Sequence, residues 1–140
     1  MGFPQRGVCS AKFCIIAFDE AAKILSSNGV SGELFADDGN GIIGGKDLDH
    51  MAQRLNRVCR DLSLWGKKCG LTFNASKTLV LLFTKLSAAR KKYEGKKLVK
   101  MDGIQIPFSN SVKYLGVTLD NKLTWKPHIE AKTTACKNPW

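Results

Sequence analysis

The 140-residue sequence lacks the patterns that mark several large classes of protein. No two of its five cysteines form a C-x-x-C pair and it has only two histidines, so the common zinc and redox motifs are excluded. No apolar run approaches the ~20 residues that a membrane span requires, and the first residues show no signal-peptide pattern. We therefore expect no membrane contact, no disulfide partner, cysteines buried as small apolar residues, and an intracellular location in the cytoplasm or the nucleus.

Acidic residues are scarce, with twelve Asp or Glu against twenty-two Lys or Arg, and the net charge is +10. A charge of this size favours polyanion partners, chiefly nucleic acid. Seven basic residues lie between positions 85 and 100 beside one acidic residue, Glu94. Two interpretations stay open for this basic stretch: it follows a phosphate backbone, or it is a solvated loop. Trp65 and Trp125 fall in helical patterns, and we expect both in the core rather than against nucleotides.

Repeats and linkers rich in Pro or Ser are also absent, which indicates one domain. A hydrophobic fraction of 44% argues against disorder. Apolar residues recur at three- and four-residue intervals from Ala11 to Leu25, which predicts a helix that ends at Asn28-Gly29. The same spacing predicts a second helix that has Asp47 as its N-cap and ends at Gly70.

The other apolar segments are short and predict strands. Residues 33–36 and 42–43 flank the turn-forming residues 37–41, which predicts a β-hairpin. Further strands are expected at 78–83, 104–106 and 112–119, and the first of them is predicted to be buried. A helix is expected to begin at Leu123, with Pro127 in its first turn. The pattern is α+β, with antiparallel β-hairpins packed on helices.

Two adjacent carboxylates, Asp37 and Asp38, are expected at the tip of the first hairpin. Adjacent like charges raise one another's pKa unless a cation neutralises them. A tight hairpin exposes its tip, where oxygen ligands can meet Mg²⁺. Asp, Asn and Gly are also ordinary turn residues, so a solvated turn is the alternative interpretation.

Five segments of the chain match known motifs in order. They are Gly2-Phe3-Pro4-Gln5-Arg6-Gly7, Phe35-Ala36-Asp37-Asp38, residues 70–78 (GLTFNASKT), residues 112–120 (VKYLGVTLD) and residues 123–129 (LTWKPHI). They are similar to the G-x-P-Q-G loop, the F/Y-x-D-D hairpin, the G-L-x-x-N-x-x-K-T segment, the primer-grip hairpin and the L-T-W-x-x-H-I run. Together they resemble the reverse transcriptase of non-LTR (LINE-type, jockey-like) retrotransposons.

The resemblance implies a polymerase palm at residues 1–120 and the start of a thumb or connection helix at 121–140. It implies that Asp37 and Asp38 bind catalytic Mg²⁺, with Mn²⁺ as a substitute, for two-metal nucleotidyl transfer. Lys77 is then expected to approach the triphosphate, although it is also suited to covering the edge of a sheet.

The same resemblance implies the substrate contacts. Gln5 and Gly7 belong to a loop beside the template and the incoming nucleotide, and Tyr114, Leu115 and Gly116 support the primer terminus. The implied partners are an RNA template, a DNA primer and dNTPs.

The chain also departs from the family pattern. The family has a further metal-binding aspartate on an upstream strand, and the acids before the hairpin here (Asp19, Glu20 and Glu33) do not replace it. Arg6 stands where a glycine is expected, and Gly tolerates backbone conformations that Arg resists. We therefore expect a fragment of an RNA-directed DNA polymerase from a mobile element that is inactive by itself.

Two other functions stay open. One is a non-catalytic nucleic-acid-binding remnant of a decayed or repurposed element. The other is an unrelated hydrolase built on the acid pair, for which the sequence offers no nucleophile, histidine base or further carboxylate cluster.

Overall fold

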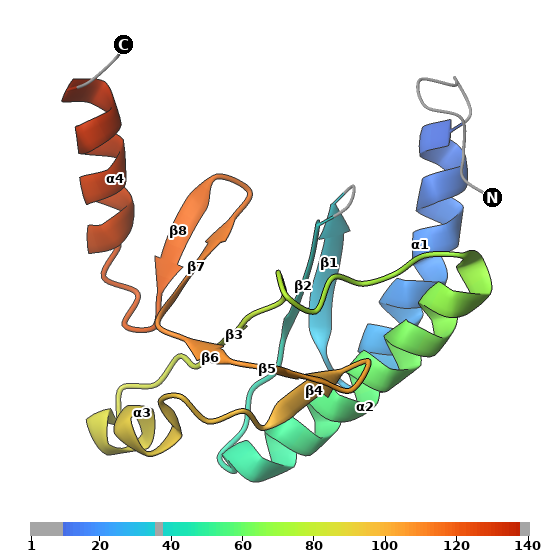
Figure 1. Cartoon of the computed structure of the whole chain (residues 1–140), viewed down its shortest axis with the longest axis horizontal. Helices are drawn as coiled ribbons and strands as arrows, with labels where there is room; N and C mark the ends of the chain where they lie inside the picture. The colour runs from blue at the N-terminus through green and yellow to red at the C-terminus, as the bar shows by residue number, and fades with distance from the viewer. Residues whose placement is uncertain (1–9, 36–37, 138–140) are drawn as a thin grey trace. The chain divides into compact units, whose positions relative to one another are not determined.

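The computed structural model describes residues 10–35 and 38–137. These residues form helices and short strands (Figure 1), which confirms the α+β prediction at the level of secondary structure. The helices are α1 (Ser10–Ser27), α2 (Leu48–Cys69), α3 (Ser87–Tyr93) and α4 (Lys126–Lys137). The strands are β1 (Ser31–Phe35), β2 (Asp38–Ile42), β3 (Val80–Leu81), β4 (Val99–Met101), β5 (Ile104–Ile106), β6 (Phe108–Ser109), β7 (Ser111–Tyr114) and β8 (Val117–Asp120). None of the helices within the described ranges is long and apolar enough to cross a bilayer.

The described strands pair two by two rather than in one sheet, and the β3–β6 pair is parallel. The chain divides into two compact units, each built from two stretches of sequence. The first unit contains residues 1–75 and 98–105, and the second contains residues 76–97 and 106–140.

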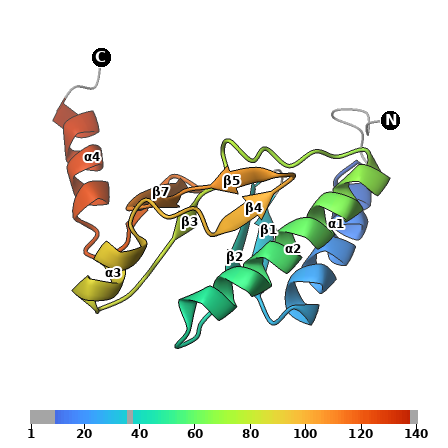
Figure 2. The same ribbon diagram turned by 60° about the horizontal axis from the view of Figure 1, so that its bottom comes forward.

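The core of the first unit lies between α1 and α2, which run side by side (Figure 2). Its buried residues come from both helices and the turn after α1: Ala21, Leu25, Val30, Val58, Leu62 and Trp65. The Trp65 ring packs between two other rings, with its centroid 5.9 Å from that of Phe18 and 6.2 Å from that of Phe73. The sequence prediction that Trp65 belongs to the core is therefore confirmed.

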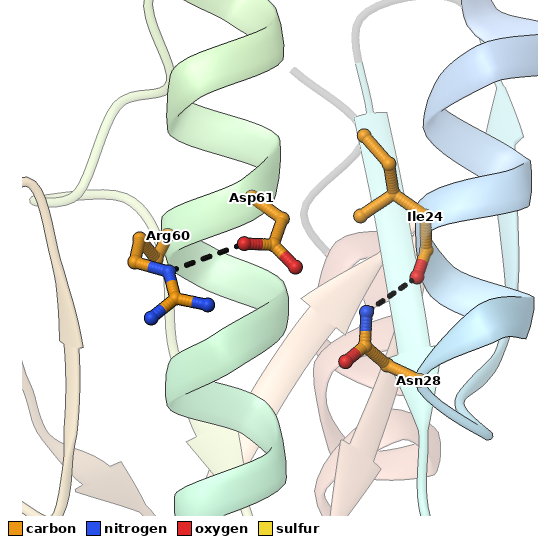
Figure 3. Close-up of polar contacts among 4 residues, drawn as sticks. All are labelled: Ile24, Asn28, Arg60 and Asp61. Carbon is orange, nitrogen blue, oxygen red and sulfur yellow. Dashed lines mark hydrogen bonds and ion pairs between the residues drawn. The ribbon is translucent and has the colours of Figure 1, made fainter.

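The predicted ends of both long helices are confirmed. The Asp47 carboxylate accepts hydrogen bonds from the amides of Asp49 and His50 at the start of α2, and Gly70 ends it with φ of 71°. At the end of α1, the side-chain amide of Asn28 donates to the Ile24 carbonyl at 2.9 Å (Figure 3).

Arg54 of α2 joins the two helices at the end of α1. Its guanidinium donates to the carbonyl of Asn28 at 2.7 Å and to that of Gly29 at 3.0 Å. A cation at this end of a helix also complements the helix dipole. The contact therefore fixes the point at which the chain leaves α1 for β1.

The side chain of Asn56 on α2 hydrogen-bonds to the backbone at the start of β4. Its amide nitrogen donates to the Leu98 carbonyl at 2.8 Å, and its amide oxygen accepts from the Lys100 amide at 2.7 Å. Lys67 of α2 and Asp102, in the turn after β4, form an ion pair at 3.0 Å. These contacts bring residues 98–105 into the first unit.

The second unit contains α3, the β3–β6 pair, the β7–β8 hairpin and α4. The predicted strand at 78–83 shrinks to Val80–Leu81, and its neighbours Leu79 and Phe83 are exposed, so the prediction of a buried strand is wrong. The basic stretch contains α3 and the first two residues of β4, and neither element was predicted from the sequence. The predicted strand at 112–119 is a hairpin, and the last helix begins at Lys126 rather than Leu123, with Pro127 in its first turn.

Candidate functional site

The F-A-D-D segment forms the end of the β1–β2 hairpin. The two strands pair antiparallel over five positions, from Ser31 opposite Ile42 to Phe35 opposite Asp38. The two residues between Phe35 and Asp38 in the sequence are Ala36 and Asp37. Both lie outside the described residues, whereas Asp38 is the first residue of β2 and its side chain is exposed.

The predicted hairpin is confirmed, but its predicted turn at 37–41 is too long. Gly39, Asn40 and Gly41 belong to β2. Gly32 of β1 and Gly41 of β2 lie where the strands and α1 pack closely. A Cβ at Gly32 would overlap the Asn40 carbonyl oxygen and lie 2.9 Å from the Leu25 side chain, and a Cβ at Gly41 would lie 3.0 Å from Val30.

The described residues do not make a complete metal site. No group of three or more His, Cys, Asp or Glu side chains lies together within the described ranges. Asp38 supplies one exposed carboxylate at the hairpin end, and the second carboxylate of the motif, Asp37, is not among the described residues. A polymerase metal pair requires more ligands than this hairpin supplies.

The other predicted substrate contacts are distributed along the chain. Lys77 is exposed and belongs to the second unit, whereas Asp38 belongs to the first. Gln5 and Gly7 lie outside the described residues.

Tyr114, Leu115 and Gly116 form the tight end of the β7–β8 hairpin. Tyr114 pairs with Val117, so Leu115 and Gly116 are the two turn residues, with φ of 46° and 81°. Positive φ at both turn positions is typical of a type I′ turn. The Leu115 side chain is half exposed, whereas the Tyr114 hydroxyl is buried and has no hydrogen-bond partner within the described part of the chain.

The loop after β8, residues 120–126, is organised around a buried carboxylate that the sequence analysis missed. Asp120 accepts hydrogen bonds from the amides of Thr124 (2.8 Å), Trp125 (3.3 Å) and Lys122 (3.3 Å), and from the Thr124 hydroxyl (3.0 Å). Burial raises the pKa of Asp120, but these donors outweigh burial and hold it below its ordinary value of 3.8. The sequence signal available was an Asp that precedes Asn-Lys in a turn-forming context.

Trp125 lies in this loop, before α4, and not in the core as the helical pattern predicted. Its side chain is 48% exposed and its φ is 61°. The prediction failed because Asp120 delays the start of the helix, so the three- and four-residue spacing does not extend to this residue.

The Asp120 loop gives an expected dependence on pH. A carboxyl with a lowered pKa in the folded state stabilises that state above its unfolded pKa, and the stabilisation is lost as the pH falls through the folded value. We expect the amides of Thr124 and Trp125 to keep their protection from hydrogen exchange above pH 3.8 and to lose it as the pH falls further below this value. NMR protection factors would measure this.

Asp120→Ala should remove the protection of the Thr124 and Trp125 amides at neutral pH. Their exchange should then no longer change as this carboxyl would titrate. The amides that pair β1 with β2 provide the control, because they belong to the other unit. Unchanged protection of Thr124 and Trp125 in the variant would show that Asp120 does not hold the loop.

The cysteines only partly follow the prediction of burial. Cys59 is buried on α2, and desolvation raises the pKa of its thiol to about 11. Cys69 and Cys136 are exposed. The correction follows from position, since Cys69 ends α2 and Cys136 lies on a helix that buries none of its residues.

Positive charge is concentrated in the second unit. Its two stretches contain twelve Lys or Arg and three Asp or Glu, a net charge of +9, whereas the first unit has ten and nine, a net charge of +1. At the end of α3, the ring centroid of Tyr93 lies 5.0 Å from the ammonium group of Lys92 and 5.0 Å from that of Lys96, which follows the helix. The basic stretch is thus partly helical, and its folded part has the charge that a polyanion attracts.

Comparison with known proteins gives two relatives. Over 132 residues, 91% of this chain, it is 27% identical to the Retrovirus-related Pol polyprotein from type-1 retrotransposable element R1 of Bradysia coprophila. Over 102 residues, 73% of this chain, it is 28% identical to the Probable RNA-directed DNA polymerase from transposon BS of Drosophila melanogaster. The chain spans only 12% and 11% of the length of these relatives.

No family model and no solved structure matches the chain. The two relatives nevertheless confirm the resemblance that the five motifs indicated. The chain is a homologue of the reverse-transcriptase proteins of non-LTR retrotransposons.

Proposed function

We propose that the chain is part of an RNA-directed DNA polymerase of a retrotransposon, with residues 1–120 in the palm and 121–140 at the start of the thumb. The observation that carries the proposal is the β1–β2 hairpin, which pairs Phe35 with Asp38 and so places the exposed Asp38 of the motif at the hairpin end. An exposed carboxylate at the end of a hairpin is open to a metal ion and its substrate, as a catalytic hairpin requires. The two relatives support the assignment to a polymerase.

Within the intact polymerase, Asp37 and Asp38 are proposed as ligands of Mg²⁺, or of Mn²⁺ in its place. Divalent cations in such a site neutralise charge on the reacting phosphates. The further ligands have to come from outside the described residues, since these contain no metal cluster of their own.

The remaining contacts are proposed for substrates. Lys77 is exposed and cationic, which suits a contact with the triphosphate of a dNTP. The β7–β8 turn presents Leu115 to solvent next to Gly116, which leaves room for the end of a DNA primer paired to RNA. Gln5 and Gly7 are assigned to the template side on the motif alone.

A chimera provides the test. The part of this chain that aligns with the R1 Pol polyprotein replaces the matching segment of that protein, and incorporation of labelled dNTPs is measured on a primed RNA template. We expect template-dependent incorporation that is lost in Asp37→Asn.

The matched control is Glu33→Gln, which removes an exposed carboxylate from β1 of the same hairpin and should leave incorporation unchanged. A chimera whose activity ignores Asp37→Asn would contradict the proposed role. For the 140-residue chain alone we expect no primer extension, since the described residues contain no complete metal site.

A non-catalytic nucleic-acid-binding protein is the second candidate, and the net charge of +9 on the second unit favours it. Binding that rests on phosphate contacts weakens linearly in log affinity as log salt rises. Asp37→Asn would leave such binding intact. Salt-dependent RNA binding together with an inactive chimera would select this function over the first.

A further inference from the structure

The loop between β8 and α4 contains two large side chains in a backbone conformation that they rarely adopt. Leu123 has φ of 53° and Trp125 has φ of 61°. Bulky residues at positive φ are genuine outliers. Such strain persists only where the surroundings hold it, and it is concentrated at active sites and ligand clamps.

Both ends of this loop are fixed. The Asp120 carboxylate accepts the amides of Thr124 and Trp125, which sets the backbone that carries the indole. On the other side of Trp125, the amide of Thr118 on β8 donates to Nδ1 of His128 in the first turn of α4 at 3.2 Å. The loop is therefore ordered before any ligand arrives, which lowers the entropy cost of binding.

The ordered loop holds apolar side chains out in solvent. Trp125 is 48% exposed and Leu123 is 51% exposed, and Ile129 on α4 is also exposed. A large aromatic ring gains more from burial than almost any other side chain. A polar indole edge and a flat apolar face make it well suited to stack against another ring.

The charges around the loop select the kind of ligand. Lys122 and Lys126 flank Leu123 and Trp125 in the sequence, both are exposed, and the unit that contains them has a net charge of +9. The ion pair of Lys126 is weak, since its Nζ lies 3.9 Å from the Glu130 carboxylate and both groups are largely exposed. The Asp120 carboxylate also lies beside the loop, but it is buried and accepts hydrogen bonds from the loop itself. A ligand that suits this loop has a ring that stacks on the indole and negative charges that the lysines contact. A nucleic-acid strand offers both, because its bases stack on aromatic side chains while Lys contacts its phosphates.

We propose that Trp125 stacks on an unpaired base of a bound nucleic-acid strand and that Lys122 and Lys126 contact the phosphates beside it. The inference rests on the proposed function in a retrotransposon polymerase, which has to hold single-stranded template. It assigns to the Asp120 loop a binding role separate from the carboxylate hairpin.

The experiment measures binding of the full chain to a short single-stranded RNA that carries 2-aminopurine, over a series of salt concentrations, with a DNA of the same sequence as a second probe. We expect Trp125→Ala to weaken binding by about tenfold at every salt concentration, in the range known for one stacked base, without changing the slope of log affinity against log salt. The quenching of 2-aminopurine by the indole should disappear in the same variant. Trp125→Phe should retain most of the affinity.

Matched variants separate stacking from charge and from folding. Lys122→Gln should lower the salt slope by about one. Leu86→Ala removes another exposed apolar side chain, 70% exposed and next to the basic residues of the same unit, and should leave binding unchanged. Circular dichroism and thermal unfolding of each variant check that it folds.

The outcomes distinguish this inference from the function on which it rests. If the wild-type chain binds neither RNA nor DNA, the proposed function fails and the inference with it. If it binds but Trp125→Ala and Leu86→Ala both match it within about twofold, only the stacking role of Trp125 is overturned. If Trp125→Ala loses self-association, measured by sedimentation, and keeps its affinity for RNA, the exposed loop is a protein interface. This result would also overturn the stacking role. Preference for one probe identifies which strand, RNA or DNA, the loop holds.

Discussion

Replacing Trp65 with alanine should lower the free energy of unfolding of the first unit by about 3–5 kcal/mol. The side chain is 3% exposed and its ring contacts those of Phe18 and Phe73, so its loss leaves a cavity between α1 and α2. Domains of this size are stabilised by about 5–15 kcal/mol in total. The variant should therefore be close to unfolding at room temperature, which urea denaturation followed by circular dichroism would measure.

Leu64→Ala is the matched control for this change. It lies next to Trp65 on α2, but its side chain is 54% exposed. We expect a loss within about 0.5 kcal/mol. Trp65→Phe should cost less than alanine, partly because the buried indole N–H has no hydrogen-bond partner among the described residues and its removal relieves a buried donor. Equal losses for Trp65→Ala and Leu64→Ala would contradict the position of the core.

The second large effect is expected from Gly32→Ala in β1. A methyl group at this position would overlap the Asn40 carbonyl oxygen on the paired strand and press on Leu25 of α1. The obstacle is backbone, which cannot rotate away as a flexible side chain does. We expect a loss of about 1–3 kcal/mol, the usual cost of overpacking, together with separation of β1 from β2.

The control for this substitution is Gly44→Ala, just after the same hairpin. Nothing lies within 4 Å of a Cβ at Gly44, so this variant should be neutral or slightly more stable than the wild type. NMR chemical shifts of Glu33 and Asp38 would report whether the hairpin stays paired. In the polymerase chimera, Gly32→Ala should also reduce nucleotide incorporation, because it displaces the end that bears the carboxylates. An intact hairpin in Gly32→Ala would refute the close approach of the strands.

The sequence predicted best where a local rule decides the structure. Asp47 and Gly70 bound α2 because capping depends on nearby backbone groups. The motifs also indicated the family that the two relatives confirm. In the candidate site, the register of the F-A-D-D hairpin could be foreseen only in outline. Its close contacts come from elsewhere in the chain: Gly32 meets Asn40 and Leu25, and Gly41 meets Val30 and Leu25. A glycine required by such packing looks the same in a sequence as one required by a turn.

The sequence predicted least where one buried polar group reorganises its surroundings. Asp120 gathers four donors from residues 122–125, and this shifts Trp125 from a helical position to an exposed one. Hydrophobic periodicity predicts which face of a helix is apolar, but it does not predict which backbone amides donate hydrogen bonds to a carboxylate. The α3 helix was missed for a related reason, because a run of lysines with one buried tyrosine has almost no apolar spacing to detect.

The attachment of β4 to α2 affects how the polypeptide can be divided and assembled. Asn56 binds Leu98 and Lys100 across 42 and 44 positions of sequence, and the residues between 75 and 98 belong to the other unit. On a ribosome, the first unit therefore stays incomplete until residue 105 has emerged, well after α2 is available to fold. A gene fragment that stops at residue 75 omits β4 and the start of β5. An expression clone has to include the intervening basic segment, or replace it with a linker that closes the same loop at a modest entropic cost.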